Sequence, residues 1–193
     1  MYCILTQSRI TEWLTPAETT YSFLSAICHD LDHPGNSNLL ERNTGTALSK
    51  KFADSPLENH HRELACATGG ILDEFGILSK VPVDTQNFIK SGMSEVILAT
   101  DMAKHAVKTG ALRTLLNRGK EALENAKSDS SIKCLFLQNL LKCADISNQG
   151  RAKPAADFWN SCIYTEFYAE GDRDRRCVQA RCLGWLLWFV RCP

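Results

Sequence analysis

The sequence predicts an all-α fold, and its apolar spacing and low proline content support this. Apolar residues recur at intervals of three and four through successive segments, strand-like alternation is hard to find, and only 6 of the 193 residues are proline. A chain of this length is enough for one ordinary domain of about 100 to 200 residues. Lys plus Arg equals Asp plus Glu, at 22 each, so no net charge favours nucleic acid or an anionic membrane as a partner.

The first helices are expected from a capping signal and from apolar spacing. A short helical piece is expected at 8–14. Thr15-Pro16-Ala17-Glu18 has the pattern of a capped helix start and should lead into a helix that ends at His29. The polar segment 36–54 is expected to carry one short helix around Ala47.

The middle of the chain contains a stronger start signal. Ser55-Pro56-Leu57-Glu58 supplies a cap, a first-turn proline and a glutamate three residues after the serine. The helix that it opens is expected to run to about Phe75 and to stop at Gly76. Asp84 is expected to cap the next helix, whose apolar residues lead towards Asp101.

Three further helices follow. Leu112 to Leu116 mark a short one, after which 120–131 is a polar connection. From Ile132 a pronounced apolar stripe runs to Asp145. Pro154 opens the last clear helix, whose packed residues are expected to be Trp159, Ile163 and Phe167.

Residues 177–193 differ in composition from the domain predicted at 1–176. The last 17 residues hold three of the nine cysteines and two of the four tryptophans. This tail is apolar without helical caps or clear periodicity, which favours an alternative or mistranslated terminus. An interfacial membrane anchor ranks lower, because that mode needs a clear amphipathic moment.

The cysteines and the N-terminal sequence indicate a soluble protein of the cytoplasm. The cysteines form no Cys-x-x-Cys pair, and most lie in apolar helical patterns, as expected of buried thiols in a reducing compartment. The N-terminus lacks the pattern of a signal peptide. The most apolar run, Leu183 to Val190, is far shorter than the roughly 20 residues that span a bilayer, so no transmembrane segment is expected.

The segment Cys28-His29-Asp30-Leu31-Asp32-His33-Pro34-Gly35 concentrates two histidines and two aspartates. Imidazole and carboxylate together suit zinc, iron, manganese or magnesium, and the spacing of His29 and His33 puts both on one helical face. The residues before them are mostly apolar and should be buried, where ionisable groups are costly unless paired or metal-bound. The alternative is a polar helix end stopped by Pro34-Gly35, and the motif alone does not separate the two.

Glu58-Asn59-His60-His61 opens a helix and allows two interpretations. Glu58 completes a capping box or holds a metal-bound water, and both roles are compatible. His60 and His61 are adjacent and point about 100° apart, so they cannot both bind one ion easily. We expect one of them to be structural and take neither as a ligand.

Two later aspartates are further candidates. Asp101 and His105 lie on one helical face. They form either an ordinary surface pair or part of a site, because the apolar helix before them directs Asp101 towards the interior. Asp145 extends a buried stripe and therefore needs a cation, a metal or a cluster of donors. Asn148, one turn later, faces the same cavity or caps the helix.

Taken together, four motifs closely resemble class I 3′,5′-cyclic-nucleotide phosphodiesterases. They are His-Asp at 29–30, Leu-Glu-Asn-His-His at 57–61, Ala-Thr-Asp-Met at 99–102 and Lys-Cys-Ala-Asp-Ile-Ser-Asn at 142–148. Their order and spacing match from about residue 1 to residue 176. The sequences of these motifs are most similar to those of the cGMP-selective, high-affinity branch.

The resemblance implies a partial phosphodiesterase-type helical bundle of the HD superfamily with two divalent ions, usually Zn²⁺ and Mg²⁺ (or Mn²⁺). The residues that match its metal ligands are His29, Asp30 and Asp145. The positions that match residues orienting the metal-bound waters are His33, Glu58 and Asp101, and Thr100 matches a residue that supports them. Asn148 and Met102 match residues of the nucleotide pocket. The implied reaction is hydrolysis of cGMP or cAMP to the 5′-nucleotide by a metal-activated water.

The chain also departs from the family pattern. The family's His-Asn-x-x-His-Ala motif, with the general acid and the remaining metal histidine, has no counterpart, because no histidine precedes His29. After 171–175 the family's Gly-Leu-Pro and the helices of its purine pocket are replaced by the tail. The resemblance therefore predicts a domain truncated at both ends, with weak metal binding and little turnover, since losing a general acid typically costs about 10²- to 10⁴-fold.

Two alternatives stay open. One is a catalytically inactive regulatory isoform, or a fragment from a faulty gene prediction, that forms a homo-oligomer or binds a full-length relative through exposed apolar surface. The other is a different HD-type nucleotide phosphohydrolase. The motifs at 58–61 and 144–148 argue against the second alternative, because the general HD pattern does not require them.

Overall fold

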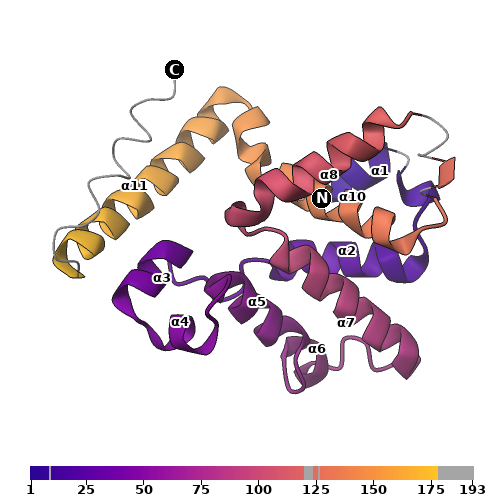
Figure 1. Ribbon diagram of the computed structural model, residues 1–193, viewed down its shortest axis with the longest axis horizontal. Helices are drawn as coiled ribbons and strands as arrows, with labels where there is room; N and C mark the ends of the chain where they lie inside the picture. The colour runs from indigo at the N-terminus through magenta and orange to yellow at the C-terminus, as the bar shows by residue number, and fades with distance from the viewer. Residues whose placement is uncertain (9, 120–123, 126, 178–193) are drawn as a thin grey trace. The chain divides into compact units, whose positions relative to one another are not determined.

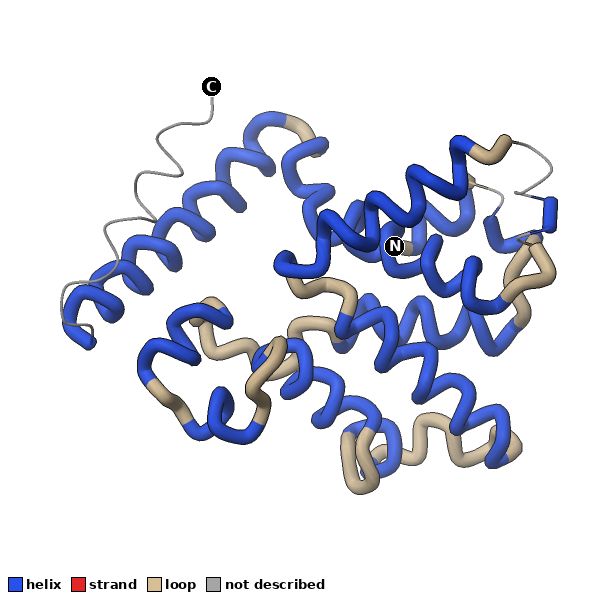
Figure 2. Tube along the Cα trace, in the orientation of Figure 1, coloured by secondary structure: helices blue, strands red, loops and turns tan. Residues whose placement is uncertain are grey.

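The computed structural model describes residues 1–8, 10–119, 124–125 and 127–177, and its regular elements are helices (Figures 1 and 2). No strand occurs in these ranges, so the all-α prediction is confirmed. The chain divides into two compact units, Met1–Asp32 with Glu58–Ser147, and His33–Leu57 with Asn148–Pro193. Among the helices described, none combines the length and apolar character that a membrane span requires.

The first unit holds most of the helices and a continuous core. In chain order its elements are α1 (Tyr2–Gln7), η1 (Ile10–Glu12), α2 (Pro16–Cys28), α5 (Pro56–Cys66), α6 (Ile71–Glu74), α7 (Val83–Leu98), η2 (Met102–Lys104), α8 (His105–Asn117) and α10 (Ser130–Asp145). Helix α2 packs against α7, and α10 contacts α2, α7 and α8 (Figure 1). The fully buried apolar residues of this core include Leu5, Ile89, Met93, Val96, Ile97, Leu137 and Leu141.

A glycine sets the distance between α2 and α7. A Cβ atom added at Gly92 would lie 2.5 Å from the ring of Tyr21, which is 2% exposed. The two helices therefore meet more closely there than any side chain at position 92 would allow. This packing, with α10 on the same core, fixes the direction in which α2 ends.

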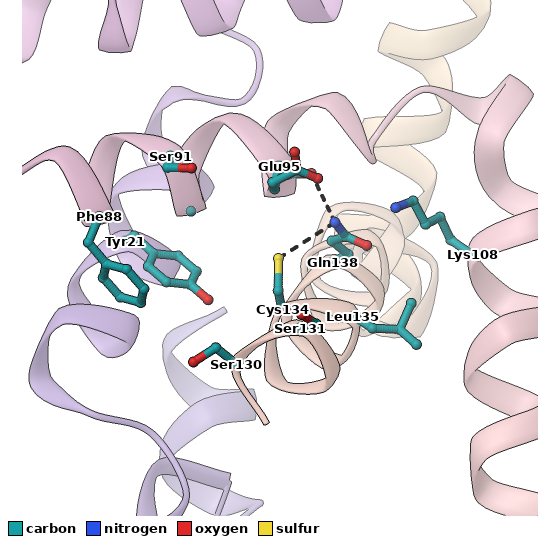
Figure 3. Close-up of a pocket in the computed structure, with 11 residues that line it drawn as sticks. Tyr21, Phe88, Ser91, Glu95, Lys108, Ser130, Ser131, Cys134, Leu135 and Gln138 are labelled. Atoms are coloured by element: carbon teal, nitrogen blue, oxygen red, sulfur yellow. Dashed lines mark hydrogen bonds between the residues drawn. The ribbon is translucent and has the colours of Figure 1, made fainter. Parts of the chain in front are cut away.

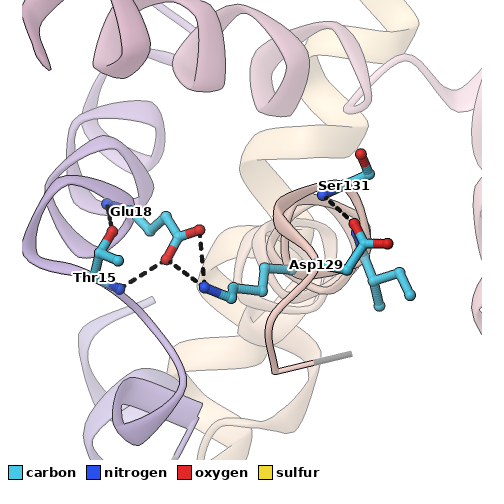
Figure 4. A network of polar contacts seen from close by, with 6 residues as sticks. Thr15, Glu18, Asp129 and Ser131 are labelled. Carbon is cyan, nitrogen blue, oxygen red and sulfur yellow. Dashed lines mark hydrogen bonds and ion pairs between the residues drawn. The ribbon is translucent and has the colours of Figure 1, made fainter. Parts of the chain in front are cut away.

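A buried ion pair joins the N-terminal halves of α2 and α10 (Figure 4). Lys133 Nζ lies 3.2 and 3.0 Å from the two carboxylate oxygens of Glu18, and the side chains are 9% and 1% exposed. Glu18 also accepts a hydrogen bond from the Thr15 backbone N–H at 2.7 Å, while Thr15 Oγ1 accepts one from the Glu18 N–H at 3.2 Å. The capping signal predicted from the sequence is confirmed, and its glutamate in addition anchors α10.

The described part of the second unit contains four helical elements. They are α3 (Asn38–Thr44), α4 (Ala47–Lys51), η3 (Ile146–Gly150), whose first residues belong to the other unit, and α11 (Lys153–Cys177). Helix α3 packs against α11. Ser37, the N-cap of α3, donates a hydrogen bond to the Glu170 carboxylate, and Arg173 Nη2 donates one to the Gly35 carbonyl oxygen at 2.5 Å.

The expected end of the helix that starts at Pro56 is wrong. Helix α5 stops at Cys66 rather than near Phe75, and the short helix α6 follows as a separate element. In the turn that follows, Gly69 adopts φ +80°, in the left-handed region, where most other side chains would be strained. A run of apolar residues at helical spacing concealed this break.

Other boundaries also differ from the expectation. Asp84 does not cap α7 but lies in its first turn, because the N-cap is Pro82. At 8–14 only the three-residue η1 forms. Helices α1 and α3 were not predicted, and α8 is longer than the predicted helix. In contrast, α2, the helix around Ala47, α10 with its end at Asp145, and the start of α11 agree with the prediction.

The side chains expected to pack on α11 are instead accessible. Trp159, Ile163 and Phe167 are 43%, 38% and 51% exposed. The prediction that this helix buries them is therefore wrong for the chain as described. The tail predicted from residue 177 onward lies outside the described residues except for Cys177, the last residue of α11.

Candidate metal centre

His29 is placed by the C-terminal end of α2. It is the C-cap of that helix, and its ring Nδ1 donates to the carbonyl oxygen of Ala26 at 3.1 Å. A hydrogen bond at Nδ1 leaves Nε2 as the nitrogen that accepts a metal or a proton. The core packing of α2 therefore determines where Nε2 points.

Two carboxylates converge on this nitrogen. Nε2 lies 3.3 Å from an oxygen of Asp145, the last residue of α10, and 3.3 Å from an oxygen of Asp30. The ligand atoms of the three residues all lie within 4.8 Å of one another. His29 is mostly buried, at 16% side-chain exposure, whereas Asp30 and Asp145 are 60% and 45% exposed. The cluster thus has a buried imidazole and two carboxylates open to solvent.

The carboxylates dominate the electrostatics of the imidazole. Burial by itself lowers the pKa of His29, but the hydrogen bonds and negative charges of Asp145 and Asp30 raise the pKa to about 10. The cluster therefore holds a positive charge strongly. A divalent cation satisfies the same two carboxylates while the imidazole binds it as a neutral ligand. One imidazole and two carboxylates form a donor set that suits zinc, manganese or iron, and three protein ligands leave positions for water.

The other predicted residues of the first unit are described by their own burial and contacts. Asp101 is buried, at 6% exposure, and its carboxylate accepts a hydrogen bond from the Ala103 N–H at 2.8 Å as the cap of η2. Thr100 Oγ1 donates to the Ile97 carbonyl oxygen at 2.7 Å. Glu58 is half-buried in the first turn of α5, and Met102 is 70% exposed.

Two predicted residues belong to the second unit and are described within it. His33 Nδ1 accepts a hydrogen bond from the Gly35 N–H at 3.1 Å. Asn148 is half-buried in η3, and its carbonyl oxygen accepts from the Arg151 N–H at 3.3 Å. Their roles toward a metal or a nucleotide stay predictions.

Lys142 is a charged residue that sequence reasoning left without a role. It is 8% exposed, and its Nζ is buried with no hydrogen-bond partner in the described part of the chain. Burial lowers the pKa of Lys142, while the negative charge of Asp101 opposes that shift and the positive charge of Lys108 adds to it. Its position one turn before Asp145 was visible in the sequence, but its burial was not.

A cavity in the first unit shares no residue with the cluster. It encloses about 440 Å³ and is lined by parts of α2, α7, α8 and α10 (Figure 3). In its wall the Gln138 side-chain amide donates to the Glu95 carbonyl oxygen at 3.1 Å and lies 3.6 Å from Cys134 Sγ. Burial raises the pKa of the Cys134 thiol to about 11, so this sulfur is not a nucleophile near neutral pH.

The fold and the cluster define an all-α protein with a candidate histidine–aspartate metal site at the C-terminal ends of two helices that pack on one core. A family model described as 3′5′-cyclic nucleotide phosphodiesterase matches residues 1–181. The chain belongs to the 3′,5′-cyclic nucleotide phosphodiesterase family, as the four motifs predicted. The family is metal-dependent, in agreement with the donor set found here.

Individual relatives are similar over nearly the whole chain. The human high affinity cGMP-specific 3′,5′-cyclic phosphodiesterase 9A is 36% identical over 180 residues, which cover 91% of this chain and 28% of the relative. The 3′,5′-cyclic-nucleotide phosphodiesterase regA of Dictyostelium discoideum is 33% identical over 180 residues, covering 92% of this chain and 22% of the relative. The chain thus spans less than a third of these curated relatives.

Two solved structures share the fold. The structure of LmjPDEB1 in complex with IBMX matches with a TM-score of 0.76 and 27% identity, covering 92% of this chain and 53% of that one. The phosphodiesterase domain of the RhoPDE fusion protein from the choanoflagellate Salpingoeca rosetta matches with a TM-score of 0.73 and 25% identity, covering 86% and 52%. The chain therefore corresponds to about half of either solved chain.

Proposed function

We propose that this chain carries part of the catalytic machinery for metal-dependent hydrolysis of 3′,5′-cyclic nucleotides to 5′-nucleotides, with cGMP as the first substrate to test. The observation that carries the proposal is the convergence of His29, Asp30 and Asp145 within a chain of this family. Relatives at 35–36% identity are high affinity cGMP-specific phosphodiesterases, whereas a human relative at 27% identity is cAMP-specific. This difference supports testing cGMP before cAMP.

In this proposal His29, Asp30 and Asp145 would hold one divalent ion, and Asp30 would also be a ligand of a second. We assign Zn²⁺ to the first site and Mg²⁺ or Mn²⁺ to the second. Metal ions in such a pair supply an activated water and neutralise charge on the phosphoryl oxygens. The residues proposed to orient metal-bound waters are His33, Glu58 and Asp101, supported by Thr100, and those proposed to contact the nucleotide are Asn148 and Met102.

Burial and exposure support this division of roles. Asp30 and Asp145 are open to solvent on one side, which leaves room for a substrate phosphate. Asp101 is buried and held by the Ala103 N–H, so its carboxylate has a fixed orientation, as a residue that positions water requires. Six of the seven described cysteines are free thiols, which supports the proposal of a reducing, cytoplasmic setting for the reaction.

The test measures metal binding and hydrolysis on the same 193-residue protein. Mn²⁺ affinity is measured by calorimetry, and conversion of cGMP and of cAMP is followed by chromatography with added Zn²⁺ and Mg²⁺. We expect hydrolysis that a chelator abolishes, and Asp145→Asn should lower both Mn²⁺ affinity and turnover at least about tenfold. The matched control is Asp157→Asn, which removes an exposed carboxylate paired with Lys153 on α11.

The proposal is judged by whether hydrolysis depends on metal and on Asp145, and not by the absolute rate of hydrolysis. Turnover that survives chelation, or that is equal in Asp145→Asn and in the wild type, would contradict the proposal. Equal Mn²⁺ affinity in the two proteins would contradict the assignment of the ligands.

A second role, self-association or binding to a full-length relative, is favoured by the exposed side chains of α11. Besides Trp159 and Phe167, this helix exposes Phe158, Tyr164 and Tyr168 at 62%, 60% and 73%. Apolar exposure on this scale marks an interaction surface or an aggregation liability. Light scattering tests self-association: a defined dimer that Phe158→Glu converts to a monomer supports this role. A protein that is monomeric and does not bind a full-length relative at micromolar concentration contradicts it.

A further inference from the structure

Two neighbouring histidines of α5 bind two successive residues of the turn that follows α2. His61, which is 1% exposed, lies with Nδ1 2.6 Å from the Leu31 carbonyl oxygen. His60 Nε2 lies 2.9 Å from a carboxylate oxygen of Asp32. Because adjacent side chains on a helix point about 100° apart, one histidine reaches the backbone of the turn and the other its side chain.

The backbone at Asp32 has a conformation that few residues adopt. Its φ is +58°, in the left-handed region, where glycine is favoured and aspartate and asparagine are the best tolerated of the others. Immediately before it, the Leu31 N–H donates to the Cys28 carbonyl oxygen at 3.2 Å and closes the turn. A contact that fixes the Asp32 side chain therefore also holds a strained backbone in place.

This turn carries Asp30, the more exposed of the two carboxylates at His29. Asp30 is 60% exposed, and the next residues along the chain are the two that the α5 histidines bind. Helix α2 by itself fixes His29, but a residue beyond the end of the helix needs another support. The contacts at Leu31 and Asp32 give that support from a different helix.

We propose that His60 is a positioning residue. Its contact with Asp32, which we call the latch, holds the turn at 30–32 in place and so orients the Asp30 carboxylate toward the metal centre. The buried His61 holds the backbone of the same turn. The functional consequence rests on the proposed metal centre, whereas the latch itself is a property of the metal-free fold. Outer contacts that orient metal ligands typically change metal affinity by about 10- to 100-fold.

Three substitutions at Asp32 separate the latch from the backbone. Asp32→Asn keeps a partner for His60 and tolerates the left-handed conformation. Asp32→Gly keeps the conformation and loses the contact, and Asp32→Ala loses both. His60→Ala removes the contact from the other side. Asp157→Asn on α11 again serves as the control for loss of an exposed carboxylate.

Metal-free protein is tested first, by hydrogen exchange of single amides. We expect the Leu31 amide to exchange about tenfold faster in His60→Ala and faster still in Asp32→Ala, with Asp32→Asn close to wild type. The amide of Val96, in the core of α7, should not change in any of them. Leu31 exchange that stays at the wild-type rate in His60→Ala, or that rises only in parallel with Val96, would overturn the latch.

Mn²⁺ binding then tests the consequence. We expect about tenfold weaker binding in His60→Ala and Asp32→Gly, more than tenfold in Asp32→Ala, and binding within about twofold of wild type in Asp32→Asn. The double variant Asp32→Gly/His60→Ala should bind no more weakly than Asp32→Gly, because both changes remove one contact. If the wild type binds Mn²⁺ and His60→Ala binds it equally well, the positioning role is wrong. If the wild type binds none, the proposed metal centre fails, and Leu31 exchange still decides the latch.

Discussion

The ion pair between Glu18 and Lys133 provides a quantitative test of how α2 and α10 are held together. Lys133→Met leaves the Glu18 carboxylate, 1% exposed, without its cation. Removing one partner of a buried pair typically costs about 3–5 kcal/mol, because the remaining charge stays buried. For a protein of this size we expect the melting temperature to fall by about 6–20 °C.

The double variant Glu18→Gln/Lys133→Met distinguishes loss of a pair from loss of packing. It buries no charge, and an uncharged pair of similar volume is often as stable as the ion pair. The Thr15 N–H can still donate to the amide oxygen at position 18. We therefore expect the double variant to be more stable than Lys133→Met by about 2 kcal/mol or more, as measured by urea unfolding followed by circular dichroism.

The pH dependence of stability gives a second readout. Burial by itself raises the pKa of Glu18, but the Thr15 N–H and the Lys133 ammonium outweigh it and lower the pKa below the usual 4.5. A lowered carboxyl pKa stabilises the fold above about pH 4.5, and this stabilisation is lost as the pH falls through the folded-state pKa. Wild-type stability should therefore fall more steeply in acid than that of Glu18→Gln.

Two results would refute this reasoning. One is a cost below about 1 kcal/mol for Lys133→Met, the range of an exposed pair. The other is an acid limb of equal slope in wild type and Glu18→Gln. The control is Lys153→Met, whose ion pair with Asp157 is 85% and 57% exposed and should matter little.

Three further substitutions test single features of the fold. Gly92→Ala should destabilise the protein by about 1–3 kcal/mol in urea unfolding, because the new methyl group meets the Tyr21 ring; an unchanged midpoint would contradict the close packing. Gly69→Ala should cost about 1–2 kcal/mol in thermal unfolding from backbone strain alone, because nothing lies within 4 Å of the added carbon; a stabilised variant would show that φ is not positive there. Lys142→Met should raise stability by about 1 kcal/mol at pH 7, and less as the pH rises, because the lowered pKa of Lys142 means that burying its charged form opposes folding. A large loss of stability, measured by urea unfolding at pH 7 and pH 9.5, would show that this ammonium has a partner.

Local sequence determined those features that depend on short-range chemistry. The capping box at Thr15 was predictable because a threonine, a proline and a glutamate at fixed spacing satisfy the free N–H groups of a helix start. The apolar stripe that ends at Asp145 was predictable because helical periodicity needs no knowledge of the partner. Histidine and aspartate were candidate ligands because of their chemistry and the family resemblance, and the family followed from four motifs in order.

Tertiary structure decided what depends on contacts between distant residues. The break after Cys66 was missed because a left-handed glycine leaves the apolar spacing unchanged. The roles of His60 and His61 stayed open because their partners, in the turn after α2, are 28 and 30 residues away in the sequence. The burial of Lys142 was likewise invisible, because a lysine is normally exposed.

The sequence alone named His29, Asp30 and Asp145 as candidate ligands, yet it could not show that they meet. His29 and Asp145 are 116 residues apart, and their atoms come within 3.3 Å only because α2 and α10 pack on one core. A ligand's identity is a property of its side chain, so it can be read from the sequence. Its distance to the other ligands depends on the packing of whole helices, which only the tertiary structure determines.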